Sequence, residues 1–159
     1  MSKKIQRMYV DTSAIGGVFD DDPFAVGCKP FFELVKQKKY IILVSDVTQL
    51  ELENAPGNVG SFLGTLPTDV IEFCQVNEEI ENLAQSYIDL GVLTSKSIND
   101  ARHVATATVY DADYIVSCNF KHLVNAIRIA KFNAVNVLKG YGTIDIKRPE
   151  EVIDYDISE

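Results

Sequence analysis

The sequence predicts an α/β fold built on a central, mostly parallel sheet, and two features support this prediction. First, short apolar runs typical of strands alternate with segments typical of helices, which is the pattern of βαβ units. Second, the run Tyr40–Val44 (YIILV) is continuously apolar and rich in β-branched residues, as expected of a strand buried on both faces. Right-handed crossovers between such strands produce a parallel sheet covered by helices.

The first half of the chain is expected to contain three strands and two helices. In chain order these are a strand at Ile5–Val10, a helix at Phe31–Lys38, the strand at Tyr40–Val44, a helix ending near Asn54 and an extended segment at Val70–Val76. Either Ser45 or Asp46 is a suitable N-cap for the second helix, and Pro56-Gly57 stops it.

The second half is expected to continue the alternation. Its predicted elements are a helix at Glu78–Leu90 closed by Gly91, a helix from about Ala101 to Tyr110, a strand at Tyr114–Ser117, a helix at Leu123–Lys131 and a short strand from Gly142 to Ile146. No internal repeat, low-complexity tract or long linker interrupts the pattern, so residues 1–159 are expected to form a single domain.

Composition is that of a soluble globular protein. Of the 159 residues 47% are hydrophobic and 24% are charged, and no apolar run is long enough for a membrane helix. The N-terminus lacks the features of a secretory signal, so a cytoplasmic location is expected. The three cysteines (Cys28, Cys74 and Cys118) show no C-x-x-C spacing and are predicted to be reduced thiols, which disfavours a structural zinc site.

The formal net charge of −8 excludes strong binding of nucleic acid by bulk electrostatics, because phosphate-binding proteins are usually basic. An acidic cluster that recruits a divalent cation resolves part of this conflict, since the cation itself attracts phosphate.

Three acids are expected at one edge of the sheet. Asp11 directly follows the first strand, Glu51 lies two turns into the helix after the second, and Asp100 begins the helix before the Tyr114–Ser117 strand. Each alone has a plain explanation: Asp11 and Asp100 as helix caps, Glu51 as a solvated glutamate. Together, three converging carboxylates repel one another unless they are protonated or bind a cation, and oxygen ligands suit Mg²⁺ or Mn²⁺.

Three segments resemble the PIN-domain nucleases, including the VapC-type toxins of toxin–antitoxin systems. They are Tyr9–Ser13 (YVDTS), Asn99–Ala107 (NDARHVATA) and Ala112–His122 (ADYIVSCNFKH). Val44-Ser45 with Glu51 six residues later resembles the middle motif of the family and selects Glu51 over Glu53. The resemblance implies a PIN-like three-layer α/β/α sandwich that cleaves single-stranded or looped RNA with Mg²⁺ or Mn²⁺. It also implies a cognate antitoxin protein and a possible homodimer.

Carried over residue by residue, the resemblance makes Asp11, Glu51 and Asp100 the metal-binding, catalytic acids. Thr12 or Ser13 would orient the Asp11 carboxylate. A further site residue, Asn119, stands where many members carry a fourth acid, and an amide binds a cation only through its oxygen and adds no charge. One metal is therefore better supported than two.

The neighbours of these acids have less specific roles. His103 lies one turn after Asp100, where it is able to donate to a carboxylate or to substrate, although a satisfied core histidine is the favoured interpretation. Lys121 and His122 are possible phosphate contacts, and a plain surface role fits Lys121 equally well. Asp113 precedes its strand, so it is expected at the opposite edge of the sheet.

Two other functions fit parts of the sequence. A degenerate PIN module that binds RNA or a protein without cutting is compatible with Asn119 and the acidic composition. A phosphatase of the haloacid-dehalogenase type with Asp11 as nucleophile is disfavoured, because that chemistry normally needs an acid two residues later, where Ser13 stands.

Overall fold

The computed structural model describes residues 4–157, and at its centre is a parallel sheet of five strands. The strands are β1 (Gln6–Val10), β2 (Tyr40–Ser45), β3 (Ile71–Cys74), β4 (Tyr114–Val116) and β5 (Ile146–Lys147). Their order across the sheet is β3-β2-β1-β4-β5, and all four pairings are parallel. The predicted parallel sheet is therefore confirmed, with β1 in the middle.

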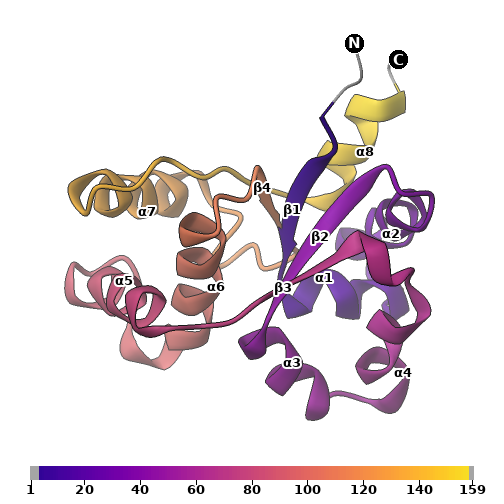
Figure 1. The fold of residues 1–159 in the computed structure, drawn as a ribbon, viewed down its shortest axis with the longest axis horizontal. Helices are drawn as coiled ribbons and strands as arrows, with labels where there is room; N and C mark the ends of the chain where they lie inside the picture. The colour runs from indigo at the N-terminus through magenta and orange to yellow at the C-terminus, as the bar shows by residue number, and fades with distance from the viewer. Residues whose placement is uncertain (1–3, 158–159) are drawn as a thin grey trace.

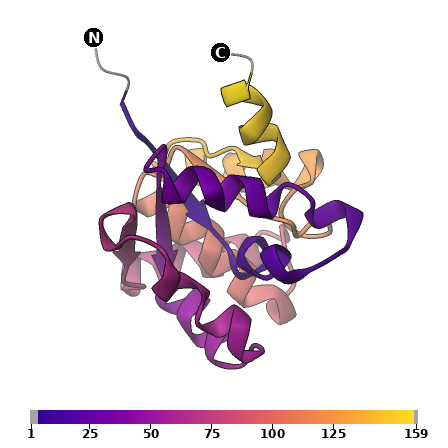
Figure 2. The same cartoon turned by 90° about the vertical axis from the view of Figure 1, so that its right-hand side faces the viewer.

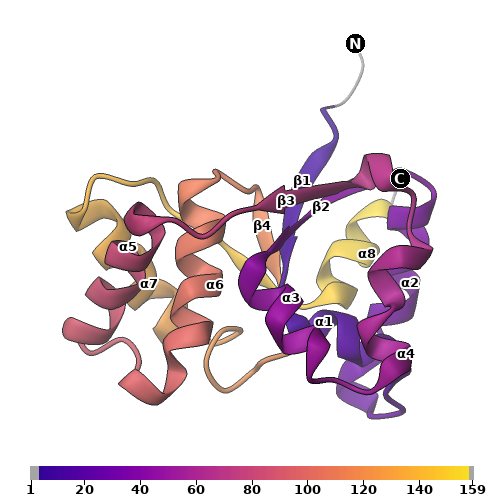
Figure 3. The same cartoon turned by 60° about the horizontal axis from the view of Figure 1, so that its bottom comes forward.

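Helices cover both faces of the sheet (Figures 1 and 3). They are α1 (Thr12–Gly16), α2 (Cys28–Lys36), α3 (Asp46–Glu53), α4 (Gly57–Gly60), α5 (Glu78–Asp89), α6 (Ile98–Val109), α7 (Ala126–Leu138) and α8 (Pro149–Ile157). One face carries α5, α6 and α7; the other carries α2 and α8, which Figure 2 shows in contact. None of the helices described combines the length and hydropathy needed to cross a membrane.

The strands separate two hydrophobic cores by the alternation of their side chains. In β1, Tyr9 packs into the core beneath α5, α6 and α7, whereas Met8 and Val10 pack into the core beneath α2 and α8. All three side chains are fully buried. This burial on both faces explains why the strand segments are almost continuously apolar. The three-layer α/β/α sandwich expected from the sequence is confirmed.

Helix α6 differs from the sequence prediction at its start. It begins at Ile98, which packs against the core beside α5, so the helix includes a turn that was predicted to lie outside it. The prediction that Asp100 is the N-cap is wrong, because Ser97 occupies that position and Asp100 lies in the first turn. The Asp100 carboxylate is thereby free to bond side chains of another segment.

The C-terminal elements also differ from prediction. The last predicted helix, Leu123–Lys131, is observed as α7 at Ala126–Leu138, because Asn125 caps it by accepting hydrogen bonds from two amides of its first turn. The predicted strand from Gly142 to Ile146 is shifted to β5, and α8 was not predicted. Main-chain pairing of Ile115 with Ile146 places β5, and local sequence does not encode that pairing.

The parallel arrangement brings the carboxyl ends of β1, β2 and β4 to one edge, where ligands of open α/β sheets usually bind. Asp11 is the first residue after β1, and Ser117 is the first after β4. Asp113 lies at the opposite edge as predicted, where its carboxylate accepts the Arg7 amide at 2.8 Å.

Candidate active site

Asp11 is a buried carboxylate at the carboxyl end of the central strand. It is only 3% exposed, and as the N-cap of α1 it accepts the Ala14 amide at 3.1 Å. The Ser13 hydroxyl lies 2.8 and 2.9 Å from its two oxygens, and the Ser117 hydroxyl donates to Oδ2 at 2.6 Å. The capping role predicted for Asp11 is therefore confirmed, and its role as a metal ligand stays a prediction.

Backbone amides determine the direction of the two serine hydrogen bonds. The Ser13 hydroxyl accepts the Cys118 amide at 2.9 Å, and the Ser117 hydroxyl accepts the Asn119 amide at 3.0 Å. Each hydroxyl has a single proton, which is directed to Asp11. Three donors thus serve a carboxylate that has about four acceptor positions, which leaves one position open.

Burial raises the pKa of Asp11, because an ionised carboxylate loses its hydration there. The hydrogen bonds from Ser117, Ser13 and Ala14, together with the charge that His103 carries when protonated, act in the opposite direction but do not outweigh burial. The site therefore holds a carboxylate whose negative charge is only partly compensated, which favours an approaching cation.

Glu51 lies close to the segment that follows Asp11. The Thr12 hydroxyl donates to Glu51 Oε1 at 3.0 Å, and His103 Nε2 lies 2.7 Å from the same oxygen. Burial alone would raise the pKa of Glu51, but the hydrogen bond and charge of His103 and the hydrogen bond of Thr12 lower it. Thr12, predicted to orient Asp11, instead bonds Glu51, and Ser13 is the one of the two that bonds Asp11.

His103 is a buried residue that links Glu51 to the sheet. It is 2% exposed, and its Nδ1 lies 2.6 Å from the Tyr9 hydroxyl, which is 2.7 Å from Ser45 Oγ. Burial raises the pKa of Tyr9, so the phenol keeps its proton at neutral pH. In the neutral form of His103, Tyr9 donates to Nδ1 and Nε2–H donates to Glu51, and in the protonated form both ring nitrogens donate. His103 is thus both a core histidine and a donor to a carboxylate.

Asp100 is held by the loop that follows β4. His122 Nδ1 lies 2.8 Å from Asp100 Oδ2, and the Asn119 amide group donates to Oδ1 at 3.4 Å. The Asn119 carbonyl oxygen in turn accepts the His122 backbone amide at 3.1 Å. His122 therefore pairs with an acid, whereas Lys121 is exposed.

One hydrogen-bond network connects Asp11 to Asp100. Ser117 bonds Asp11 and the Asn119 amide, and the Asn119 side chain reaches Asp100. Sequence reasoning missed the roles of Ser117 and of Tyr9. The available signal for Ser117 was its position at the end of a predicted strand, but only the pairing of β4 with β1 brings it to Asp11.

The donor types suit Mg²⁺ or Mn²⁺, because carboxylate oxygens are the usual ligands of these ions. Among the described side chains, those of residues 4–153, however, no three of His, Cys, Asp or Glu are grouped so that they could hold a metal ion. Glu51 faces Thr12 and His103, and Asp100 faces His122, so protein donors occupy these carboxylates. The carboxylate oxygens of these acids are suitable ligands for a hard cation. In this structure, the acids form hydrogen bonds with protein groups.

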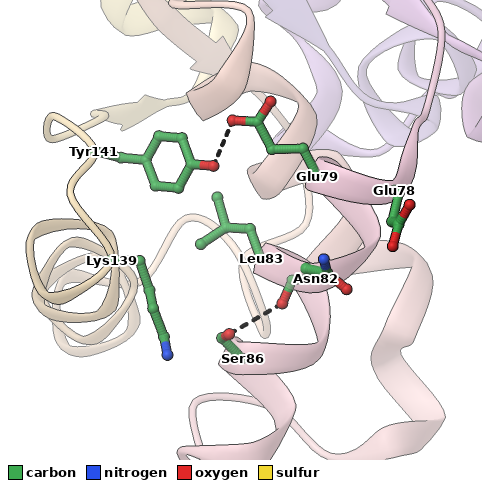
Figure 4. A pocket seen from close by; sticks show the side chains of 7 residues that line it. All are labelled: Glu78, Glu79, Asn82, Leu83, Ser86, Lys139 and Tyr141. Atoms are coloured by element: carbon green, nitrogen blue, oxygen red, sulfur yellow. Dashed lines mark hydrogen bonds between the residues drawn. The ribbon is translucent and has the colours of Figure 1, made fainter.

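A cavity of about 450 Å³ elsewhere contains none of the predicted site residues (Figure 4). It lies between α5 and the segment after α7, where the Tyr141 hydroxyl donates to Glu79 at 2.6 Å. Lys139 and Leu83 also line it. This cavity is thus separate from the acids at the carboxyl edge of the sheet.

Comparison with known proteins identifies the class of fold. No family model matches the chain, and no curated protein sequence matches it either. Among solved structures, the chain has a counterpart with a similar fold. The chain is similar to Mycobacterium tuberculosis VapC20, a sarcin-ricin loop cleaving toxin, with a TM-score of 0.51 and 19% sequence identity over 68% of this chain and 86% of that chain. The expected resemblance is therefore confirmed at the level of the fold.

Proposed function

We propose that this protein is a metal-dependent endoribonuclease that cleaves single-stranded or looped RNA. The observation that carries the proposal is the hydrogen-bond network around Asp11, which joins it to Asp100 at the carboxyl edge of the sheet. Its setting is a fold shared with an RNA-cleaving toxin. Thr12, next to Asp11 in the chain, connects the same edge to Glu51.

In this proposal Asp11, Glu51 and Asp100 hold Mg²⁺ or Mn²⁺, which supplies Lewis-acid stabilisation of charge on the scissile phosphate. The chain's own contribution is to position the acids and to oppose the effect of burial on the ionisation of Asp11 and Glu51. Ser13 and Ser117 direct their protons at Asp11, and His103 lowers the pKa of Glu51. To bind the cation, Glu51 and Asp100 would exchange their present protein donors for it.

Asn119 has a positioning role in the proposal. Its amide group donates to Asp100 and its carbonyl oxygen accepts from the His122 amide, so it fixes the Asp100 carboxylate without adding charge. A single cation fits this arrangement better than two. The alternative is a degenerate module that binds RNA or a protein without cutting, and it is favoured by the absence of a three-ligand metal group in the part of the chain that the structure describes.

Cleavage of a mixed pool of structured RNAs tests the proposal, with purified protein in Mg²⁺, Mn²⁺ or EDTA. We expect fragments with either metal and none in EDTA, and we expect Asp100→Asn to abolish them while its melting temperature stays close to that of the wild type. A folded wild-type protein that cuts no RNA under any of these conditions would identify the degenerate module instead.

A thermal melt with added Mn²⁺ gives a readout that is independent of activity. A ligand that binds only the native state raises its stability in proportion to its occupancy. We expect Mn²⁺ to raise the melting temperature of the wild type and to leave Asp11→Asn unchanged. An equal rise in both proteins would assign the cation to another place.

The biological setting belongs to the same proposal. We propose a single PIN-like domain that acts in the cytoplasm as the toxin of a type II toxin–antitoxin pair, with a cognate antitoxin protein as partner and possible homodimerisation. Co-expression with the product of an adjacent gene, followed by size-exclusion chromatography, measures both the partner and the number of copies in the complex.

A further inference from the structure

A cavity of about 430 Å³ lies directly beside Asp11 and has no part in the chemistry proposed above. It is formed by the residues after β1, by the loop containing Asp20 and Asp22, and by the loop after β4. Its size falls within the range of about 300–1,000 Å³ that is usual for small-molecule sites. Ser13 lines this cavity and also donates a hydrogen bond to Asp11, so a single side chain separates the cavity from the acid.

Two aromatic rings form another wall of the cavity. Phe24 and Phe120 meet edge to face, with ring centroids 5.5 Å apart and an angle of 64° between the planes. Phe120 thus supports Phe24 from the side, while the residue Phe24 remains 64% exposed. A large apolar side chain exposed beside a cavity indicates contact with a ligand more often than one scattered alone on a surface.

The backbone around Phe24 is held in place before any ligand arrives. Phe24 lies in a short 3-10 helix, Pro23–Ala25, and the carboxylate of Asp22 accepts the Phe24 amide at 2.9 Å. Proline at the start of this helix further restricts the backbone. The backbone that carries the ring is therefore preformed and the ring itself contacts Phe120, which reduces the entropy lost when a flat ligand stacks on it.

Charge decides which part of an RNA fits here. The carboxylates of Asp20 and Asp22 line the cavity and repel phosphate, and the whole chain has a net charge of −8. An uncharged base has no such penalty, and its amino and imino groups are able to donate to carboxylate oxygens. Single-stranded RNA is commonly bound by stacking its bases on aromatic side chains.

We propose that this cavity is a base-binding subsite, in which one unstacked nucleobase of the RNA stacks on Phe24 independently of the cation that would hold a neighbouring phosphate at the acids. The inference rests on the proposed function for the identity of the ligand. It explains how an acidic protein holds RNA, because base stacking replaces most of the phosphate contacts that basic proteins make. The salt dependence of binding should accordingly be shallow.

The test is binding of a short fluorescently labelled single-stranded RNA in EDTA, where no cleavage interferes. Loss of one stacked base corresponds to roughly a tenfold to hundredfold weaker affinity. We expect that loss in Phe24→Ala, and near wild-type affinity in Phe24→Tyr, which keeps an aromatic ring. Phe73→Ala is the matched control, because Phe73 is equally exposed, at 62%, and does not line this cavity.

A second arm removes the ligand's base and not the ring. An oligonucleotide lacking the bases of its central nucleotides should bind the wild type as weakly as the complete RNA binds Phe24→Ala. Equal binding of the complete and base-free RNAs by the wild type, or equal binding by wild type and Phe24→Ala, would overturn the proposal.

The two proposals fail separately in these experiments. Metal-dependent cleavage with RNA binding unchanged in Phe24→Ala would preserve the nuclease and eliminate the base subsite. RNA binding that depends on Phe24, from a protein that cuts no RNA, would preserve the subsite and eliminate the nuclease.

Discussion

The Nε2 atom of His103 lies 2.7 Å from Oε1 of Glu51, and this contact couples a fully buried part of the core to an acid of the candidate site. Behind the imidazole, the Tyr9 hydroxyl lies 2.6 Å from Nδ1 and 2.7 Å from Ser45 Oγ. Four side chains from β1, β2, α3 and α6 thus form one polar chain. The contribution of this polar chain to the free energy of unfolding and its effect on the pKa of Glu51 are both measurable.

Tyr9→Phe is expected to destabilise the protein by about 1–3 kcal/mol, because it leaves His103 Nδ1 and Ser45 Oγ without their buried partner. Urea unfolding measures the change. Tyr141→Phe is the matched control, since its hydroxyl also makes a side-chain hydrogen bond, to the Glu79 carboxylate at 2.6 Å, but on the surface. We expect the control to lie within about 0.5 kcal/mol of the wild type. An equal loss of unfolding free energy in the two variants would mean that burial does not make the hydrogen bonds of Tyr9 more important for stability than that of Tyr141.

The stability of Asp11→Asn relative to the wild type should depend on pH, measured in EDTA. Burial raises the pKa of Asp11 above its ordinary 3.8, so the native state binds the proton more tightly than the unfolded chain. The contribution of Asp11 to the free energy of unfolding of the wild type is present at low pH, and it is lost as the pH rises through the pKa of Asp11 in the folded state. Asn carries no charge, so the free energy of unfolding of Asp11→Asn should increase relative to that of the wild type as the pH rises from about 3 to 7.

Glu51→Gln should show the opposite pH dependence. The pKa of Glu51 is lowered from its ordinary 4.5, so the wild type is stabilised above that value and loses this contribution as pH falls through the folded pKa. The variant should be less stable than the wild type at neutral pH, and the difference should shrink toward about pH 3. Thermal melts over this range measure both variants. Parallel curves for the two would contradict the opposite shifts.

Two adjacent glycines should respond in opposite directions to alanine. A Cβ at Gly17 would lie 2.3 Å from Cys28 Sγ, so we expect Gly17→Ala to cost about 1–3 kcal/mol. A Cβ at Gly16 meets no atom within 4 Å, and Gly16 has a helical φ of −58°, so Gly16→Ala should stabilise by about 0.4–1 kcal/mol. Combining Gly17→Ala with Cys28→Ala should recover part of the loss. Similar effects of the two single variants would contradict the close packing at Gly17.

Asn119→Asp should make the stability of the protein depend more strongly on a divalent cation. The change replaces a donor 3.4 Å from Asp100 by a second carboxylate, and like charges at such a distance cost about 1 kcal/mol or more. We expect a lower melting temperature in EDTA and a larger rise with Mn²⁺ than in the wild type. An Mn²⁺ response identical to that of the wild type would show that Asn119 lies outside the cation's surroundings.

Asp11 was accessible to sequence reasoning because its position follows from local pattern, whereas Glu51 was selected over Glu53 by resemblance to the PIN-domain nucleases. Asp11 ends an apolar strand run, and its neighbours Thr12 and Ser13 favour a cap. The structure gives these neighbours different partners, since Ser13 bonds Asp11 and Thr12 bonds Glu51. Which hydroxyl faces which acid depends on the direction of α1 relative to α3, and a linear pattern does not contain that direction.

The sequence by itself determined four of the five strands, most of the helices and the parallel character of the sheet, because periodicity and burial on both faces are properties of local segments. Only the tertiary structure decided the order of the strands, and with it the partners of each acid. Ser117 reaches Asp11 across 106 positions of sequence because β4 pairs with β1, and His122 reaches Asp100 because the loop after β4 folds toward α6. Such pairings are selected by the packing of whole layers, so no single segment specifies them.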